Sequence, residues 1–155
     1  MFHPTEIMTG AEGLEQLREL TKTVKFCMLA TRTAAGDIRS RPMTLQQTEF
    51  EGDLWFFTSK SSALSDDIVH DSSVNISFAR ANRMEFISIT GHGRFVDDPG
   101  KIRELWRPAY AEWFPTGIED PDLALLQVEI TYAEHWDEAK GQVNSIRGVA
   151  EESRA

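Results

Sequence analysis

The sequence predicts a mostly β protein of the α+β class, in which six antiparallel strands form a barrel with helices inserted at three points. Three observations support this prediction. Six segments have the alternating or aromatic-rich pattern of strands, short turns join most of them, and strands and helices do not alternate as βαβ units. The chain also has neither a glycine-rich dinucleotide fingerprint nor a P-loop, so a doubly wound parallel sheet is not expected.

Length and composition limit the number of domains and the classes of partner. A chain of 155 residues suits one domain, which we expect over residues 1–137, followed by a polar C-terminal tail over 138–155. The net charge of −9 argues against nucleic acid as a partner. No apolar run has the length of a membrane span and the N-terminus lacks the pattern of a signal peptide, so a cytoplasmic location is expected.

The first predicted element is an amphipathic helix over residues 10–22, for which Thr9 is a candidate cap. It presents one stripe of leucines, Leu14, Leu17 and Leu20. Residues 26–33 follow as a buried strand that contains the single cysteine, Cys27, which we interpret as a small buried hydrophobe. A hairpin turn over 34–37 leads into the next strand.

That second strand, over residues 38–47, contains Pro42. Proline cannot donate to a β ladder, so the strand is predicted to be an edge strand or to be bulged at this point. Backbone groups beside Pro42 are then free to pair with something other than a neighbouring strand. An ordinary edge proline explains the same residue without a ligand.

The third strand, residues 54–58, runs through a polar turn into a helix over 62–71. Backbone N–H groups at a helix start are unpaired and the helix dipole favours an anion, so this turn is a candidate phosphate site with Lys60 beside it. The simpler alternative is that Ser61 or Ser62 caps the helix. These residues alone favour the cap.

Three more strands and one helix complete the prediction. They are the strand over 73–79, the strand over 86–96, a helix that begins at 97–99, and a last strand over 123–136. Gly91 and Gly93 permit a kink or bulge in the second of these strands. The residues after 138 are polar and are expected to form a loose tail.

Side chains that could perform chemistry unaided are scarce. The four histidines are scattered singly without the spacing of metal ligands, so no metal site is predicted. No Gly-x-Ser-x-Gly elbow is present, and Trp106, Trp113 and Phe114 are interpreted as core or as a subunit interface. If the protein is an enzyme, a cofactor carries the difficult step.

Several motifs, in this order, resemble one family. They are Ser-Arg-Pro-Met-Thr-Leu at 40–45, Leu-Trp-Phe-Phe-Thr-Ser-Lys-Ser-Ser at 54–62, Val-Asn-Ile-Ser-Phe at 74–78, Ile-Ser-Ile-Thr-Gly and Val-Asp-Asp within 87–98, and Glu-His-Trp-Asp at 134–137. The chain is similar to the FMN-binding split-barrel proteins, the relatives of pyridoxamine 5′-phosphate oxidase, and in particular to the general stress protein branch. The resemblance implies a six-stranded split barrel and a homodimer that binds FMN between its subunits.

The resemblance also implies which residues contact FMN. The cofactor-binding residues it points to are Arg41, Pro42, Met43, Thr44, Phe57, Thr58, Ser59, Lys60, Ser62 and Trp136. In the family, the strand that matches residues 41–45 contacts the flavin ring, the match to Phe57-Thr58 contacts ring and ribityl chain, and the following turn receives the phosphate. The residue that matches Trp136 approaches from the other subunit.

Two departures from the family pattern bear on function. Leu64 stands where the family has a basic residue, so Lys60 is expected to serve the phosphate instead. The oxidase also has a C-terminal Arg-x-His-like substrate clamp, whereas the tail here contains Arg147 but no Arg-x-His pattern, so oxidation of pyridoxamine phosphate is disfavoured. The resemblance leaves three alternatives: a general stress-type flavin-dependent oxidoreductase of unknown substrate, a non-catalytic module that sequesters FMN, and a split barrel that has lost its cofactor.

Overall fold

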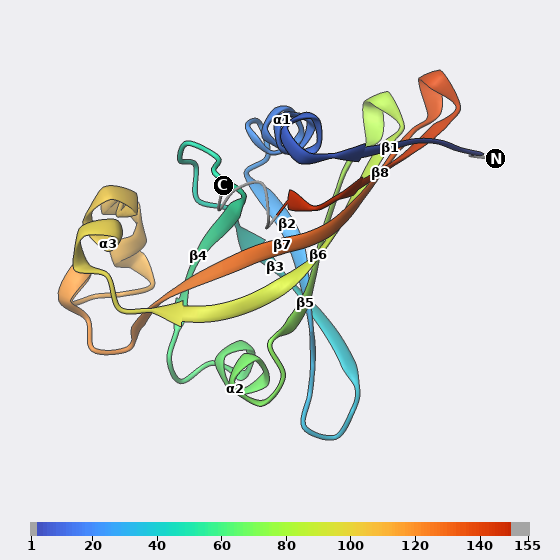
Figure 1. The fold of residues 1–155 in the computed structure, drawn as a ribbon. Coiled ribbons are helices and arrows are strands. Elements are labelled where there is room, and N and C mark those ends of the chain that lie inside the picture. The colour runs from blue at the N-terminus through green and yellow to red at the C-terminus, as the bar shows by residue number, and fades with distance from the viewer. Residues whose placement is uncertain (1–2, 150–155) are drawn as a thin grey trace.

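The computed structural model describes residues 3–149 and contains one mixed eight-stranded sheet with three helices (Figure 1). The elements are β1 (His3–Thr9), α1 (Gly10–Thr21), β2 (Phe26–Arg32), β3 (Ile38–Thr44), β4 (Asp53–Ser59), α2 (Ala63–His70), β5 (Ser73–Arg80), β6 (Glu85–Val96), α3 (Pro99–Leu105), β7 (Leu123–Asp137) and β8 (Gln142–Arg147), with four short 3₁₀ turns. The mostly β, α+β class predicted from the sequence is confirmed.

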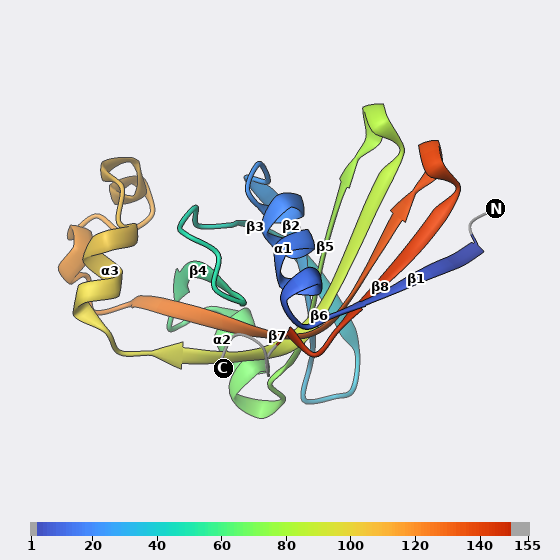
Figure 2. The same ribbon diagram turned by 45° about the horizontal axis from the view of Figure 1, so that its top comes forward.

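The sheet is organised around the long strand β7. Its strands are ordered β1-β8-β7-β6-β5-β2-β3, and β4 pairs with β7 outside this path. The first half of β7, from Leu123, pairs with β4, and its last residues, up to Asp137, pair with β8. Among the described residues, β3 pairs with β2 alone and β4 with β7 alone, so each of these two strands has one edge outside the sheet. The barrel is open between them (Figure 2).

All six predicted strands are present, together with the helices expected near residues 10, 63 and 99. Pro42 lies in an edge strand, as predicted. The sequence did not predict β1 or β8, and these two strands pair in parallel, so the sheet is mixed rather than purely antiparallel.

The expected loose tail is wrong for residues 138–149. This segment turns back through a short 3₁₀ turn and adds β8 beside β7, with Val143, Ile146 and Val149 buried. Only two residues of the six-residue strand are apolar, too few for a strand signal, and β7 supplies the hydrogen-bond partners that fix it. Residues 150–155 lie outside the described part of the chain.

A β-bulge bends the β6–β7 pair. The register shifts between Thr90 and Gly91, as the glycines in this strand predicted. A Cβ atom on Gly91 would lie only 2.3 Å from the carbonyl oxygen of Glu129, so no other residue fits without a backbone shift. The bend divides the long ribbon into one arm beside β4 and another beside β8 (Figure 2).

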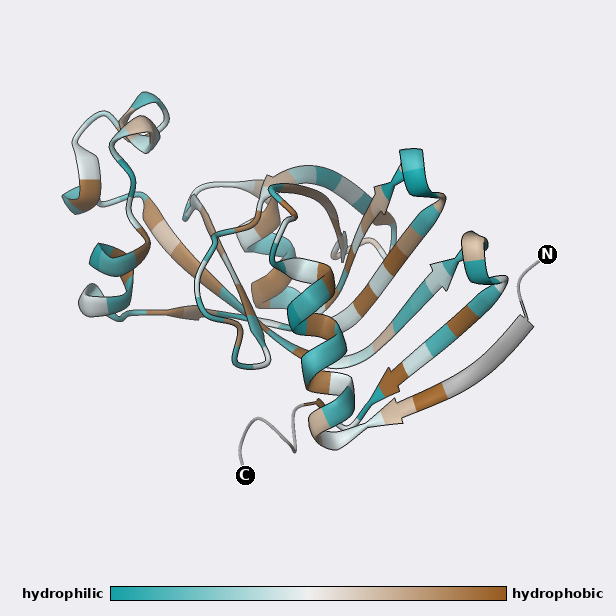
Figure 3. Ribbon diagram, turned by 90° about the horizontal axis from the view of Figure 1, so that it is seen from above, coloured by the Kyte–Doolittle hydropathy of each residue, from teal (hydrophilic) through white to brown (hydrophobic). Residues whose placement is uncertain are grey.

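The core lies inside the curved sheet and under the helices. Apolar and polar residues alternate along the strands, as the hydropathy colouring shows (Figure 3). The leucine stripe of α1 packs inward through Leu17 and Leu20, while α2 contributes Leu64 and Ile68. Cys27 is also buried, and burial raises its thiol pKa to about 12. No helix within residues 3–149 is both long and apolar enough to cross a membrane.

Candidate functional site

A groove of about 340 Å³ lies between the two strands that border the opening of the barrel. Its lining residues are Pro42, Met43 and Thr44 of β3, Phe57, Thr58 and Ser59 of β4, Gln46, and Tyr110, Trp113 and Phe114. One backbone hydrogen bond ties the two walls, from the N–H of Gln46 to the carbonyl of Trp55, at 3.0 Å. Strand edges that no neighbour occupies offer backbone donors and acceptors to a ligand.

An aromatic wall closes one side of the groove. Phe57 stands edge-on to Trp106 and Tyr110, with ring centroids 6.0 and 5.7 Å away, and Trp106 also contacts Phe114. The hydroxyl of Tyr110 donates to the Oε1 atom of buried Gln46 at 2.8 Å, which fixes the ring against β3. Aromatic pairs of this geometry form a rigid surface that a flat ring system can contact.

The sequence did not predict that these wall residues line the groove. Trp113 and Phe114 were predicted to belong to the core or to a subunit interface, and neither Gln46 nor Tyr110 was predicted as a binding residue. Phe114 is indeed buried, but Trp113 is 67% exposed. The turn that carries Tyr110, Pro108–Glu112, is far from β3 and β4 in sequence, and only the density of aromatic residues there marked it as unusual.

The turn between β4 and α2 supports the cap interpretation. The Oγ atom of Ser62 accepts a hydrogen bond from the N–H of Ser65 at 3.2 Å and donates to the carbonyl of Ser59 at 2.7 Å. Its hydroxyl also lies 3.3 Å from the hydroxyl of Thr58, which lines the groove. Ser62 therefore caps α2 at the edge of the groove, and its hydroxyl is next to that of the lining residue Thr58.

The other face of this turn already binds a carboxylate. Ser61 donates to Asp122 twice, through its N–H at 3.0 Å and its hydroxyl at 2.9 Å, and the N–H of Lys60 donates to the Asp122 carbonyl at 2.7 Å. The Lys60 side chain is exposed and borders a neighbouring hollow of about 410 Å³ rather than the groove. The turn thus presents donors to anionic oxygen, as helix starts do.

Arg41 faces α2 instead of the groove. Its Nη1 atom donates to the Thr31 hydroxyl at 2.8 Å and to the Leu29 carbonyl at 3.3 Å, and its Nη2 atom lies 3.4 Å from Asp67 Oδ2. Asp67 accepts a shorter bond, 2.7 Å, from the Thr31 hydroxyl. The guanidinium is therefore a half-buried cation beside α2, held to its carboxylate partner by one long contact. Leu64, where a basic residue was expected, packs in the core.

Trp136 lies far from the groove of its own chain. It sits near the end of β7, whereas the other end, at Leu123, pairs with Ser59 of the groove. Across the sheet, Trp136 is opposite Phe86 of β6, and strand register through β5 and β2 places it about four strand spacings, roughly 19 Å, from Thr44, so it does not line the groove. The structure therefore gathers six of the ten predicted residues in one groove. Arg41 and Ser62 lie next to α2. Lys60 borders the neighbouring hollow, and Trp136 lies outside the groove.

A barrel that is open between two strand edges, with a groove in the opening, defines a split barrel. The chain belongs to the pyridoxamine 5′-phosphate oxidase like family, whose model matches residues 12–153.

Individual relatives agree with this assignment. Protein bli-3 of Neurospora crassa is 30% identical over 150 residues, which cover 90% of this chain and 72% of that protein. The general stress FMN/FAD binding protein of Xanthomonas citri is 34% identical, with a TM-score of 0.68 over 81% of this chain and 89% of its own. A Clostridium acetobutylicum protein related to general stress protein 26 has a TM-score of 0.73 at 18% identity, over 86% of this chain and 93% of its own. The split-barrel fold class is thereby confirmed.

Proposed function

We propose that the groove between β3 and β4 binds FMN and that the protein is an FMN-binding protein of the general stress type. The observation that carries this proposal is the groove itself, two unpaired strand edges facing an aromatic wall beside a capped helix start. The relative from Xanthomonas citri, one third identical to this chain, is named a general stress FMN/FAD binding protein.

The chemistry of the groove suits the parts of FMN. Backbone groups of Pro42 and Thr44 point to the free edge of β3, where they would meet the polar rim of a flavin ring, and Phe57 would supply an apolar contact. The hydroxyl of Thr58 lies between the groove and the start of α2, which would receive the phosphate. Arg41 would bind this phosphate if its guanidinium left the long contact with Asp67 for a charge-assisted bond.

A second copy of the chain completes the site in this proposal. The outer face of β2 and β3 exposes large apolar side chains: Phe26 is 63%, Met28 40% and Ile38 72% exposed. Such a patch beside the groove favours burial against another protein surface. A homodimer that covers this face also lets Trp136 of one subunit reach the groove of the other, which its own chain does not allow.

Bound FMN would supply the redox chemistry. Within the described residues, Tyr110 is the only titratable side chain that lines the groove, so the protein contributes binding and orientation rather than acid–base groups. Whether FMN turns over a substrate or is only sequestered is decided by anaerobic reduction with NADH or NADPH. A cytoplasmic location stays a prediction.

Oxidation of pyridoxamine phosphate is not part of this proposal. Arg147, the arginine of the described part of the tail, lies at the end of β8. Its guanidinium stacks over the Tyr132 ring at 5.6 Å, on the arm of the ribbon away from the groove. Release of hydrogen peroxide from pyridoxamine phosphate by the FMN-loaded protein would contradict this exclusion.

The visible absorbance of the purified protein tests FMN binding directly. A flavin spectrum, or saturable binding of added FMN at one molecule per chain, is the expected result. Riboflavin, which lacks the phosphate, should bind more weakly than FMN because the α2 start and Arg41 then have no anion to contact. A colourless protein that binds neither compound would overturn the proposal.

A further inference from the structure

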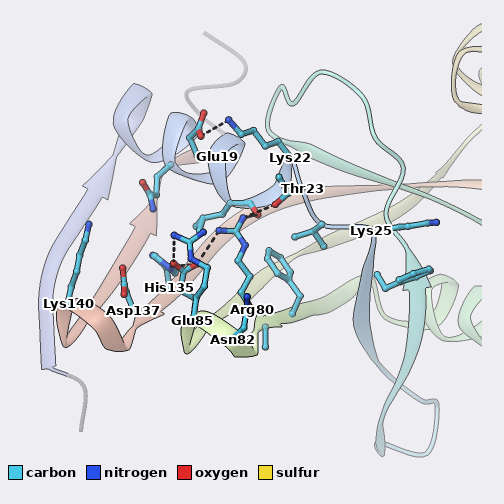
Figure 4. Close-up of a pocket in the computed structure, with 17 residues that line it drawn as sticks. Glu19, Lys22, Thr23, Lys25, Arg80, Asn82, Glu85, His135, Asp137 and Lys140 are labelled. Atoms are coloured by element: carbon cyan, nitrogen blue, oxygen red, sulfur yellow. Dashed lines mark hydrogen bonds and ion pairs between the residues drawn. The ribbon is translucent and has the colours of Figure 1, made fainter.

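A second and larger hollow, of about 810 Å³, lies below the C-terminal end of α1 on the other arm of the ribbon (Figure 4). Glu85, His135 and Asp137 line it, and the close-up shows their side chains gathered at its floor. Glu85 of β6 is directly opposite Asp137 of β7, and His135 is opposite Asn144 of β8. Cross-strand partners and residues two apart share one face of a sheet, so four polar side chains from three strands meet there.

These four residues are buried, between 4 and 7% exposed. Both ring nitrogens of His135, Oδ1 of Asp137 and Oδ1 of Asn144 have no hydrogen-bond partner among the described residues. Buried polar atoms are nearly always paired, because desolvation without a partner costs about 1–3 kcal/mol per group. Four such atoms on one face of the sheet indicate that something absent from the protein itself occupies the space.

The unpaired atoms are mainly acceptors. A carboxylate oxygen and an amide oxygen only accept, and a neutral imidazole adds one acceptor and one donor. An occupant that satisfies these acceptors is therefore either a cation or a hydrogen-bond donor such as water.

Glu85 and Asp137 place two carboxylates at this point of the hollow, whose lining also includes the basic residues Lys22, Lys25, Arg80, Arg83 and Lys140. Glu85 is held by Arg80 at 3.1 Å and by the exposed Arg83 at 3.5 Å, whereas the carboxylate of Asp137 has no ion-pair partner in residues 3–149. His135 Nε2 lies 3.9 Å from Glu85 Oε2, too far for a hydrogen bond. Ligand atoms around a tetrahedral ion lie roughly 3.4 Å apart for bonds of about 2.1 Å, so small side-chain rotations would let these residues hold one ion.

We propose that Glu85, His135 and Asp137 bind a divalent transition-metal ion of the zinc or manganese type, with Asn144 beside it as a further oxygen donor. One ligand atom from each of the three lies within 4.8 Å of the others. Imidazole with carboxylates suits zinc and manganese, whereas magnesium and calcium prefer oxygen alone. The prediction of no metal site rested on spacing along the chain, whereas strand register brings these three residues together.

The metal would lock the ends of β6, β7 and β8 together. Trp136 stands between two of the ligands and, by strand alternation, points to the opposite face. The ion would thereby fix the backbone that presents this tryptophan. The metal site does not depend on FMN, since it lies in a different hollow.

Calorimetric titration of the chelator-treated full chain with zinc chloride and with manganese chloride tests the proposal. We expect one ion per chain, and His135→Gln and Asp137→Asn should each weaken binding by at least about tenfold. His92→Gln is the matched control, because His92 is exposed and contacts only the Ser72 hydroxyl among the described residues. Elemental analysis of the protein as purified gives the stoichiometry independently.

Two outcomes would overturn the metal site. One is the absence of binding of either ion to the folded wild type, in which case water fills the space. The other is unchanged binding in folded His135→Gln and Asp137→Asn. Circular dichroism verifies folding, and if the histidine variant does not fold, the near-isosteric Asp137→Asn alone decides. Flavin content, measured on the same samples, keeps this result separate from FMN binding.

Discussion

The groove between β3 and β4 and the hollow under α1 lie on the two arms of one bent ribbon, and they differ in how their polar groups are satisfied. Around the groove, Arg41, Ser61 and Ser62 already have partners within the chain. In the hollow, His135 and Asp137 have buried atoms without a hydrogen-bond partner in the described part of the chain. The groove can therefore stand empty at little cost, whereas the hollow is costly when empty.

This difference separates two kinds of site. A ligand of the groove must compete with existing contacts and gains affinity from shape, aromatic surface and charge. A ligand of the hollow removes a penalty already present in the fold, so its binding should raise stability directly. The predictions below change one feature at a time, from the largest expected effect to the smallest.

The bulge that joins the two arms gives the largest effect. Gly91→Ala places a Cβ atom against the Glu129 carbonyl and should lower the free energy of unfolding by about 3 kcal/mol. Urea denaturation measures this loss. Gly100→Ala, in the first turn of α3, is the control and should be neutral or slightly stabilising, because its Cβ atom would make only an ordinary contact of 3.4 Å with Asp98 Oδ1. Equal stability of both variants would show that the bend does not need glycine.

Arg41 tests whether the groove ligand carries a phosphate. Arg41→Ala should raise the dissociation constant for FMN by about ten- to a hundredfold, the value of a charge-assisted hydrogen bond, and should change riboflavin binding much less. Fluorescence titration gives both constants. Arg39→Ala removes the same charge from an exposed position of β3 and should have little effect. An equal loss for FMN and riboflavin would mean that Arg41 supports the fold rather than the phosphate.

Lys60 should contribute less to FMN affinity than Arg41. Its side chain is exposed and borders a different hollow, so Lys60→Ala should weaken FMN by only about two- to fivefold, as expected of a solvated ion pair. The effect should shrink further in high salt. A loss as large as that of Arg41→Ala would contradict this order and would place the phosphate on the Lys60 face of the turn. The same titration at two salt concentrations decides.

The smallest expected effect concerns Cys27, whose thiol should not be alkylated in the native protein. It lies behind the groove, with its thiol 3.8 Å from the carbonyl of Met43, and its pKa of about 12 keeps it protonated at pH 8. Thiolate is the reactive form, so iodoacetamide should leave the native protein unlabelled and label it after denaturation. Mass spectrometry of the intact chain measures the labelling. Rapid labelling of the native state would show that β2 and β3 separate readily.

The sequence predicted the groove better than the hollow because the two are encoded differently. Pro42 to Thr44 and Phe57 to Ser59 belong to short local patterns of strand, turn and helix start that a sequence shows directly. Glu85 and His135 become neighbours only through the register of the strands that carry them, which depends on the bulge at Gly91. Tyr110 was missed for a related reason, because tertiary packing alone brings its turn to β3.

Strand β8 was missed because its pattern is weak, and its position has a consequence for synthesis of the chain. β1, near residue 3, pairs in parallel with β8, near residue 142. At translation rates of roughly 5–20 residues per second, β1 waits on the order of ten seconds for its partner to be made. During that interval its edge is open to other chains. The nascent protein should therefore depend most on chaperones before β8 emerges from the ribosome, and not after.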